Sequence, residues 1–192
     1  MASSFIIMKS ELYLDKRVCV MACGGSIDRH EIDFASYDTV VGINRLYKTK
    51  YFPHMHVLYD AAHFVFDPVS KDKIGIMNDS SLKSWILVPG IITYDAMDKA
   101  LLEGCRIPHF ISQDRFYAPP VRIVLGIYVI KDILKENPKT LDVYGFDFYE
   151  GGYADGLRQM DPNGKIDDLY NLERQKGFMK EILQNNPRMR QP

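Results

Sequence analysis

The chain has 192 residues, of which 46% are hydrophobic and 26% are charged, and its formal net charge is −1. This composition is typical of a globular domain with a sizeable buried core, and it excludes the chain-wide basic field that would indicate a nucleic-acid partner. The three cysteines are too few for a disulfide framework, and no signal peptide or membrane-spanning apolar segment is recognisable, so we expect a cytoplasmic protein.

Strands and helices are predicted to alternate along the chain. Short apolar runs indicate strands at residues 18–23, 39–44, 56–60, 85–89 and 106–111. A further strand is expected at 141–149, and a polar loop follows it. We expect a weak helix or turn at 27–35, a helix at 93–103, and a last helix at about 169–183 followed by a frayed tail. The alternation predicts an α/β fold, in which a single domain over residues 1–192 contains a mainly parallel sheet with helices on both faces.

The longest apolar segment follows two prolines, Pro119 and Pro120. Apolar residues at helical spacing extend from Val121 to Ile133, and proline is favourable in the first turn of a helix. We therefore expect a buried central helix that begins at this point. Residues 151–165 are polar and contain several glycines, which predicts a lid loop.

Polar residues follow four of the predicted strands. Any one of these groups could be a turn or a helix cap. In a parallel sheet, however, the carboxyl ends of the strands meet at one edge, and ligands bind there. We therefore predict a binding site at this edge. The four groups are Gly24-Gly25-Ser26, Asn44-Arg45, Tyr59-Asp60 and Asp147-Phe148-Tyr149.

The adjacent glycines Gly24 and Gly25 end the first predicted strand. One glycine is enough for a tight turn, whereas two indicate either an awkward turn or a group that approaches the main chain closely. Backbone N–H groups at such a position suit a ligand phosphate or sugar. The stretch is neither GxGxxG nor a P-loop, which disfavours a dinucleotide-dependent reductase.

Two tyrosines and two aspartates near the predicted lid could carry chemistry. Tyr149 and Tyr153 flank a Glu-Gly-Gly loop and are either surface aromatics or donors to a phosphate that gains negative charge in a transition state. Asp167 and Asp168 precede the last helix. One of them caps that helix, or one of them is a general base for an acceptor hydroxyl.

No metal site is expected. The five histidines are scattered, and His54 and His56, which alternate near a strand, have no third ligand at a recognisable spacing. Arg115, Arg122 and Arg158 lie near the expected site, where they could bind phosphate or simply be solvated.

In their order along the chain, these motifs resemble the bacterial sialyltransferase family that includes the Campylobacter lipooligosaccharide enzymes and related transferases that use CMP-activated sugars. The resemblance rests on "ACGGSIDRHEID" at 22–33, "VVGIN" at 40–44, the strand that ends at Tyr59-Asp60, and "GFDFYEGGYA" at 145–154. It extends in patches from Val18 to Leu183.

The resemblance implies a Rossmann-like domain, a GT-A-like variant, and an inverting reaction that needs no metal and no cofactor besides the CMP-sugar donor. It implies that a histidine of the lid, with which Asp168 aligns here, removes the acceptor proton and that two tyrosines hydrogen-bond the leaving phosphate. The residues predicted for catalysis are Asp168, Asp167, Tyr149 and Tyr153. The residues predicted to bind the donor are Gly24, Gly25, Ser26, Asn44, Asp60, Pro119, Pro120 and Asp147.

This chain departs from the family pattern at several positions. Asp60 stands where the family has an asparagine, and Pro119-Pro120-Val121 stand where it has Thr-Ser-Gly before the central helix. The catalytic histidine of the lid has no histidine counterpart, and Asp168 aligns with it. These differences argue against assuming sialic acid as the donor sugar.

We therefore predict a glycosyltransferase that moves a sugar from a nucleotide sugar, expected to be CMP-linked, to an acceptor hydroxyl. The acceptor is a surface glycan or a hydroxymethylated base in phage DNA, which would have to be flipped out. The DNA alternative rests on the small size of the chain and its lack of membrane anchors, with Arg188 and Arg190 as phosphate contacts. A non-catalytic nucleotide-binding or assembly protein is the remaining alternative, and a homo-oligomer is compatible with the sequence.

Overall fold

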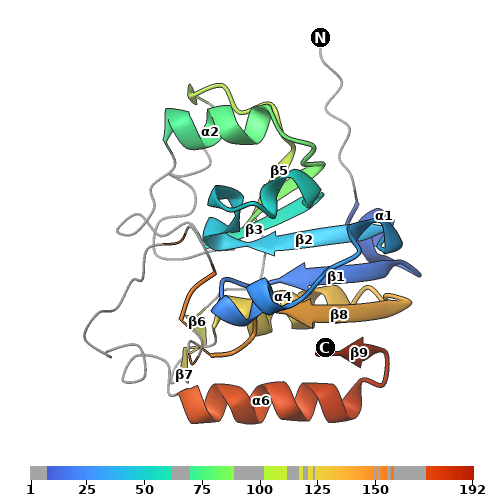
Figure 1. The fold of residues 1–192 in the computed structure, drawn as a ribbon. Coiled ribbons are helices and arrows are strands. Elements are labelled where there is room, and N and C mark those ends of the chain that lie inside the picture. The colour runs from blue at the N-terminus through green and yellow to red at the C-terminus, as the bar shows by residue number, and fades with distance from the viewer. Residues whose placement is uncertain are drawn as a thin grey trace.

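Seven strands form one sheet in a computed structural model that describes residues 8–61, 70–88, 102–111, 117–118, 121–122, 124–148, 150, 152–154, 157 and 172–192. The strand order is β5-β4-β3-β2-β1-β8-β9, and every neighbouring pair is parallel (Figure 1). The strands are β1 Arg17–Met21, β2 Thr39–Ile43, β3 Val57–Ala61, β4 Ser84–Val88, β5 His109–Ile111, β8 Thr140–Tyr144 and β9 Met189–Arg190. A separate antiparallel pair consists of β6 Tyr117–Ala118 and β7 Val121–Arg122.

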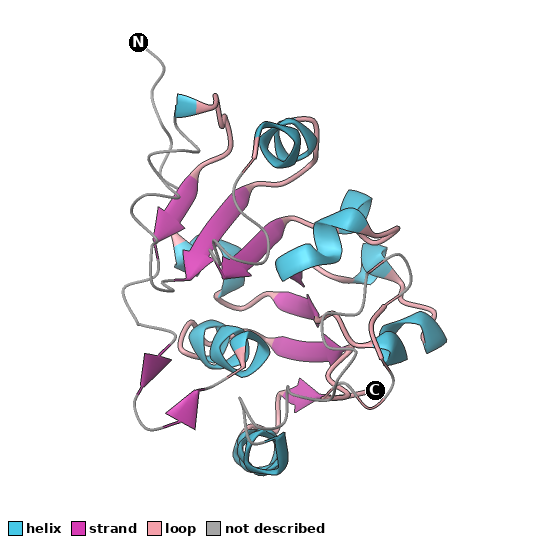
Figure 2. Cartoon of the chain, turned by 90° about the vertical axis from the view of Figure 1, so that its left-hand side faces the viewer, coloured by secondary structure: helices cyan, strands magenta, loops and turns pink. Residues whose placement is uncertain are grey.

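Helices lie on both sides of this sheet (Figure 2). Residues that alternate along the strands enter two apolar clusters, so that Val18 and Val20 of β1 belong to one cluster and Cys19 and Met21 to the other. The first cluster is covered by α1 Lys9–Tyr13, α4 Leu125–Leu134 and α6 Leu172–Asn185. The second is covered by α2 Lys71–Asn78 and the 3-10 helices η1 Gly25–Arg29, η2 Phe34–Ser36, η3 Asn44–Lys48 and η4 Phe52–His54.

Strands β2 and β4 are buried along their whole length, because both of their faces are covered. The strand order changes direction at β1. Strands β2 to β5 follow on one side of it, and β8 lies on the other side. In doubly wound sheets, the crevice at this change of direction, beyond the carboxyl ends of the strands, is where ligands bind.

The predicted α/β fold with a mainly parallel sheet and helices on both faces is confirmed, and the predicted strands differ from the observed ones by a few residues. The start of the central helix was wrong. Val121 lies in β7, and α4 begins only at Leu125. Helices α1 and α2 were not predicted. Most of the helix expected at 93–103 and most of the lid expected at 151–165 lie outside the described residues.

The prediction of a frayed tail was also wrong. Residues Met189 and Arg190 form β9, which pairs with Leu141 and Asp142 of β8. The Met189 side chain is buried in the core, and the Arg190 guanidinium forms an ion pair with Asp142. Both contacts link residues far apart in the sequence, so local composition could not reveal them. No helix among the described residues is long and apolar enough to cross a membrane.

Candidate functional site

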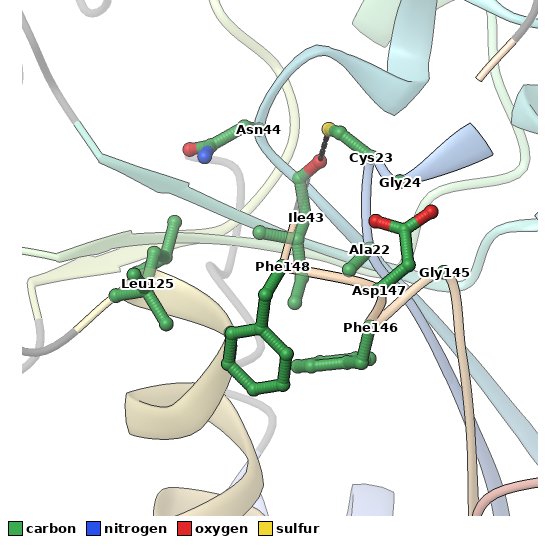
Figure 3. Close-up of a pocket in the computed structure, with 12 residues that line it drawn as sticks. Ala22, Cys23, Gly24, Ile43, Asn44, Leu125, Gly145, Phe146, Asp147 and Phe148 are labelled. Carbon is green, nitrogen blue, oxygen red and sulfur yellow. Dashed lines mark hydrogen bonds between the residues drawn. The ribbon is translucent and has the colours of Figure 1, made fainter. Parts of the chain in front are cut away.

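A pocket with about 520 Å³ of empty space, which includes its open mouth, lies at the carboxyl ends of β1, β2 and β8 (Figure 3). The pocket lies beside β1, where the strand order reverses. Its lining residues are Ala22, Cys23, Gly24, Ile43, Asn44, Val124, Leu125, Gly126, Gly145, Phe146, Asp147 and Phe148.

The turn after β1 explains the first of the two adjacent glycines. The Gly24 N–H donates to the Gly145 carbonyl at 3.0 Å. A Cβ atom on Gly24 would lie 2.2 Å from Oδ1 of Asp147 and 2.4 Å from the Gly145 carbonyl oxygen. Gly24 is therefore required by the loop after β8, which approaches the turn closely whether or not a ligand is bound. The Gly25 N–H donates to the Gly152 carbonyl at 3.0 Å, which joins the turn to a third segment.

Asp147 and Ser26, two residues predicted for the donor site, contact each other. The Asp147 carboxylate accepts a hydrogen bond from the Ser26 backbone N–H at 2.9 Å. Tyr153 is next to the same turn, because it forms an isolated antiparallel bridge with Gly24. The adjacent Ala154 N–H donates to the Cys23 carbonyl at 2.8 Å. The structure thus brings the turn after β1, the loop after β8 and the segment around Tyr153 together at the pocket.

Five other predicted residues lie outside the described part of the chain. Their positions relative to the pocket therefore stay predictions. They are Pro119, Pro120, Tyr149, Asp167 and Asp168.

Asn44 and Phe148 line the pocket with backbone conformations that side chains rarely adopt. Asn44 has φ +52° and Phe148 has φ +50°. Asparagine tolerates this left-handed region, whereas a bulky aromatic residue in it is an outlier. The Asn44 side chain is held by the β3 strand end, because its Oδ1 accepts from the Ala61 N–H at 3.1 Å. Strained backbone of this kind is concentrated at binding and active sites.

Asp60, at the end of β3, does not line the pocket. Its side chain is 5% exposed and forms an ion pair with Lys73 of α2, with 2.5 Å between Oδ2 and Nζ. The resemblance implied that this residue sits near the donor sugar. The structure shows that its carboxylate is engaged inside the protein.

The amino-terminal end of α4 forms one wall of the pocket through Val124, Leu125 and Gly126. Val124 is the N-cap and provides no side-chain cap for the first turn. The partial positive charge of a helix N-terminus and the N–H groups of its first turn favour an anion at this wall. A Cβ atom on Gly126 would lie 2.4 Å from the Phe146 ring, so a glycine lets that ring pack against the first turn. Sequence reasoning missed this wall because it began the helix too early.

Cys23 is a pocket residue as well as a neighbour of the core. Its thiol donates to the Ile43 carbonyl at 3.3 Å. Burial raises the pKa of the thiol to about 12, so it stays protonated at neutral pH and is not a nucleophile. Among the described residues, no group of three or more His, Cys, Asp or Glu side chains could hold a metal ion.

The site therefore combines apolar and aromatic walls with one amide side chain and the positive end of a helix. Such a lining suits a ligand with an anionic group and a flat or apolar portion. The neutral Cys23 thiol gives it no nucleophile, and the hydrogen bond from Ser26 occupies part of the Asp147 carboxylate. Within the described residues the pocket is better suited to binding than to proton transfer, so a general base would have to come from elsewhere.

Comparison with known proteins gives similarity at the level of structure. No protein-family model matches the sequence, and no curated protein sequence is significantly similar to it. The structure resembles that of the sialyltransferase CstII from Campylobacter jejuni in complex with cytidine-5'-monophosphate, with a TM-score of 0.61 and 14% sequence identity over 93% of this chain and 80% of that one. A complex of the same enzyme with the substrate analogue CMP-3FNeuAc gives a TM-score of 0.58 at 14% identity over 92% and 80%.

The monofunctional alpha-2,3-sialyltransferase Cst-I from Campylobacter jejuni is a further match. Its TM-score is 0.55, with 14% identity over 96% of this chain and 76% of that one. At these identities the similarity shows a shared fold. The resemblance inferred from the motifs is therefore confirmed in the fold, over nearly the whole chain.

Proposed function

We propose that this chain is a glycosyltransferase that uses a CMP-linked sugar as donor. The observation that carries the proposal is the pocket beside β1, where the turn after β1, Asn44 and the open N-terminus of α4 face one space. The fold supports it, because structural neighbours with this fold are sialyltransferases, one of them in complex with CMP.

The described residues divide into two groups suited to the two ends of a nucleotide. The first turn of α4 favours the phosphate, because its N–H groups and the helix dipole stabilise negative charge. The aromatic rings of Phe146 and Phe148 and the Asn44 side chain suit a base and a ribose. We expect Ser26 and Asp147 to act indirectly, since they contact each other and fix the turn.

In the proposed reaction, an acceptor hydroxyl attacks the anomeric carbon in line and inverts it. The bond from that carbon to the phosphate oxygen breaks, and CMP leaves with the electron pair. Asp168 or Asp167 takes the hydroxyl proton. The hydroxyl groups of Tyr149 and Tyr153 donate to the departing phosphate, and no metal is needed to stabilise its charge.

We propose a glycan as the acceptor. The alternative of a hydroxymethylated base in DNA depends on basic residues near the site. Arg190 is engaged by the buried Asp142 rather than projecting from a tail, which weakens its proposed role in binding DNA phosphates. Both acceptors are included in the test, because the described residues favour neither by direct contact.

The test is a transfer assay followed by mass spectrometry. The protein is incubated with CMP-linked, UDP-linked and GDP-linked sugars, each with glycan acceptors and with hydroxymethylated DNA. The masses of the products are then measured. Transfer from a CMP-sugar that is lost in Asp168→Asn and reduced in Tyr153→Phe is the expected result. Transfer from another nucleotide sugar would overturn the CMP assignment. CMP binding without transfer to any acceptor would favour the non-catalytic alternative, and no binding of any nucleotide would overturn the proposal.

A further inference from the structure

A nearly fully buried ion pair joins β3 to α2. Lys73 of α2 and Asp60 of β3 are 2.5 Å apart, and their side chains are only 2% and 5% exposed. The Lys73 ammonium also lies 5.1 Å from the ring centre of Tyr47 and 5.6 Å from that of Trp85, within the range of cation–π attraction. A lysine so deeply buried is rare unless it is paired, because desolvation of the charge is costly.

This ion pair is connected to the pocket wall at Asn44. The residue after Asp60, Ala61, donates its N–H to the Asn44 side chain at 3.1 Å. Asn44 is the first residue of the 3-10 helix η3, and Tyr47, which contacts the Lys73 ammonium, belongs to the same helix. The strand end that carries Asp60 and the helix that begins at Asn44 are thus held by one cation.

The charge of Asp60 also reaches the pocket. The pKa of the Cys23 thiol, which lines the pocket, is raised mainly by burial and in part by the negative charge of Asp60. A carboxylate so close to the pocket repels an anionic ligand unless a cation compensates for it. Lys73 compensates for it through the ion pair, where both side chains are shielded from solvent.

We infer that Lys73 is a positioning residue for the binding of an anionic ligand: as the internal counter-ion of Asp60, it removes the repulsion between that carboxylate and a nucleotide phosphate and holds the strand end that supports Asn44. This inference rests on the proposed function, since it takes the ligand to be a nucleotide. It assigns Asp60 an indirect role in place of a contact with the donor. It also assigns a role to a helix, α2, that lies outside the motifs shared with the sialyltransferases.

The test compares CMP with cytidine, which lacks the phosphate. Calorimetric titration of both ligands is carried out on the wild type, Lys73→Met, Asp60→Asn and the double variant Asp60→Asn/Lys73→Met. Lys71→Met is the matched control, because Lys71 is on the same helix and its ion pair with Glu103, at 3.6 Å, leaves the lysine side chain 82% exposed. Thermal unfolding of every variant is measured beside the titrations.

Lys73→Met should weaken CMP binding by about tenfold relative to cytidine binding, since one uncompensated charge then acts on the phosphate through protein. Asp60→Asn/Lys73→Met should restore the ratio of the two affinities, and Asp60→Asn alone should strengthen CMP binding relative to cytidine binding, because Lys73 is then an uncompensated cation. Lys71→Met should leave the affinities for both ligands unchanged.

Three results would overturn the inference. The first is an equal loss of CMP and cytidine in Lys73→Met, which would show a purely structural role. The second is an unchanged CMP affinity in Lys73→Met. The third is a double variant that folds and still discriminates against CMP. A wild type that binds neither ligand would instead overturn the proposed function, and the inference with it. If Lys73→Met does not fold, Asp60→Asn decides the matter, because it leaves Lys73 as an uncompensated cation. CMP binding should then strengthen relative to cytidine binding, and an unchanged or smaller ratio would overturn the inference.

Discussion

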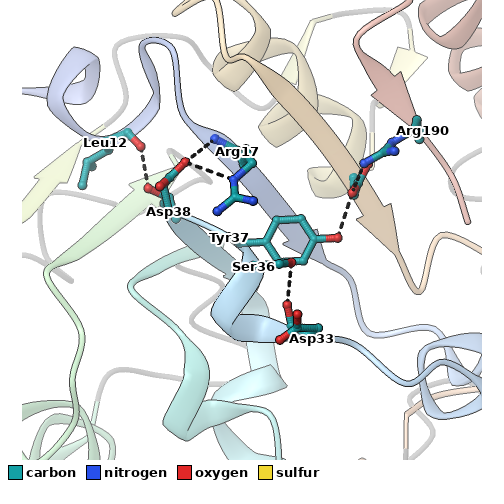
Figure 4. A network of polar contacts seen from close by, with 9 residues as sticks. Leu12, Arg17, Asp33, Ser36, Tyr37, Asp38 and Arg190 are labelled. Atoms are coloured by element: carbon teal, nitrogen blue, oxygen red, sulfur yellow. Dashed lines mark hydrogen bonds and ion pairs between the residues drawn. The ribbon is translucent and has the colours of Figure 1, made fainter.

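The pocket and the polar network around Asp142 use the same sheet in opposite ways. In the network, the buried Asp142 carboxylate accepts from Nε and Nη2 of Arg190, each at 2.7 Å, and from the Tyr37 hydroxyl at 2.7 Å. Figure 4 shows the two donor side chains, Tyr37 and Arg190. The Tyr37 hydroxyl is also 3.0 Å from that of Tyr144. At the pocket, by contrast, the backbone is strained at Asn44 and Phe148.

The difference is that the polar groups around Asp142 are hydrogen-bonded to one another, whereas the first turn of α4 at the pocket can bind a ligand. Around Asp142, burial raises the pKa of the Tyr37 phenol, and its hydrogen bonds to Tyr144 and Asp142 raise it further, so that it stays a neutral donor. Arg190 has its pKa raised by its hydrogen bond to Asp142. Such a satisfied network adds stability and leaves no group for a ligand. The first turn of α4 and the strained strand ends offer groups to a ligand at some cost in stability.

Among the variants that test this difference between the two regions, Gly24→Ala should have the largest effect on stability and nucleotide binding. The new Cβ overlaps the Gly145 carbonyl and the Asp147 carboxylate, so the loop after β8 must move. We expect a loss of about 1–3 kcal/mol in the free energy of unfolding and the loss of nucleotide binding, measured by urea denaturation and calorimetry. Gly75→Ala in α2 is the control, because a Cβ there meets no atom within 4 Å. It should stabilise the protein by about 0.5–1 kcal/mol. Equal effects of both variants would contradict the packing argument.

Arg190→Met should reduce stability and leave the pocket unaffected. The variant leaves the buried Asp142 carboxylate without its bidentate partner. Because the Arg190 side chain is 64% exposed, solvent can replace part of the lost interaction. We therefore expect the free energy of unfolding, measured by urea denaturation, to fall by about 1–3 kcal/mol. CMP affinity should stay that of the wild type. Lys180→Met, an exposed position on α6, is the control. A fall in CMP affinity in Arg190→Met would show that the two regions are coupled.

Asn44→Ala tests the strained strand end at the pocket. The variant loses the hydrogen bond from Ala61 and places an alanine at φ +52°, so about 1–2 kcal/mol of stability should be lost along with nucleotide affinity. Asn44→Gly should be more stable than Asn44→Ala, because glycine removes the backbone strain, but it should still be less stable than the wild type, because the hydrogen bond is also lost. Asn137, with φ +54°, has the same backbone conformation away from the pocket. Asn137→Gly should leave ligand binding unchanged, and a loss of binding there would contradict the distinction.

The smallest effect concerns His56, which precedes β3. Its Nδ1 accepts from the Val40 N–H at 3.2 Å. Burial, and then the charge of Lys83, lower its pKa in the folded protein. The unfolded chain therefore takes up the proton first, so this contribution to stability is complete above a pH of about 6.5 and decreases as the pH falls through that value. Urea denaturation between pH 5 and 8 should show this dependence, and it should diminish in His56→Gln. An unchanged dependence in that variant would assign it to other groups.

Much of the sheet was predictable because its strands are short apolar runs that end at glycine or polar residues. The same logic found Gly24, Asn44 and Asp147, since carboxyl ends of parallel strands must meet. The start of α4 was not predictable from the prolines, because pairing with β6 places Val121 in a strand. The partner of Asp60 was missed because α2 itself was missed. That helix has only weak apolar periodicity, and its lysine is buried through contacts with Tyr47 and Trp85.

A crystal structure of the protein grown with saturating CMP would show whether the pocket beside β1 binds a cytidine nucleotide. We expect CMP in the space between Gly24, Asn44 and Phe148, with its phosphate at the first-turn N–H groups of Leu125 and Gly126. CMP bound at another place, or crystals in which this pocket stays empty at saturating CMP, would show that the pocket is not a cytidine nucleotide site.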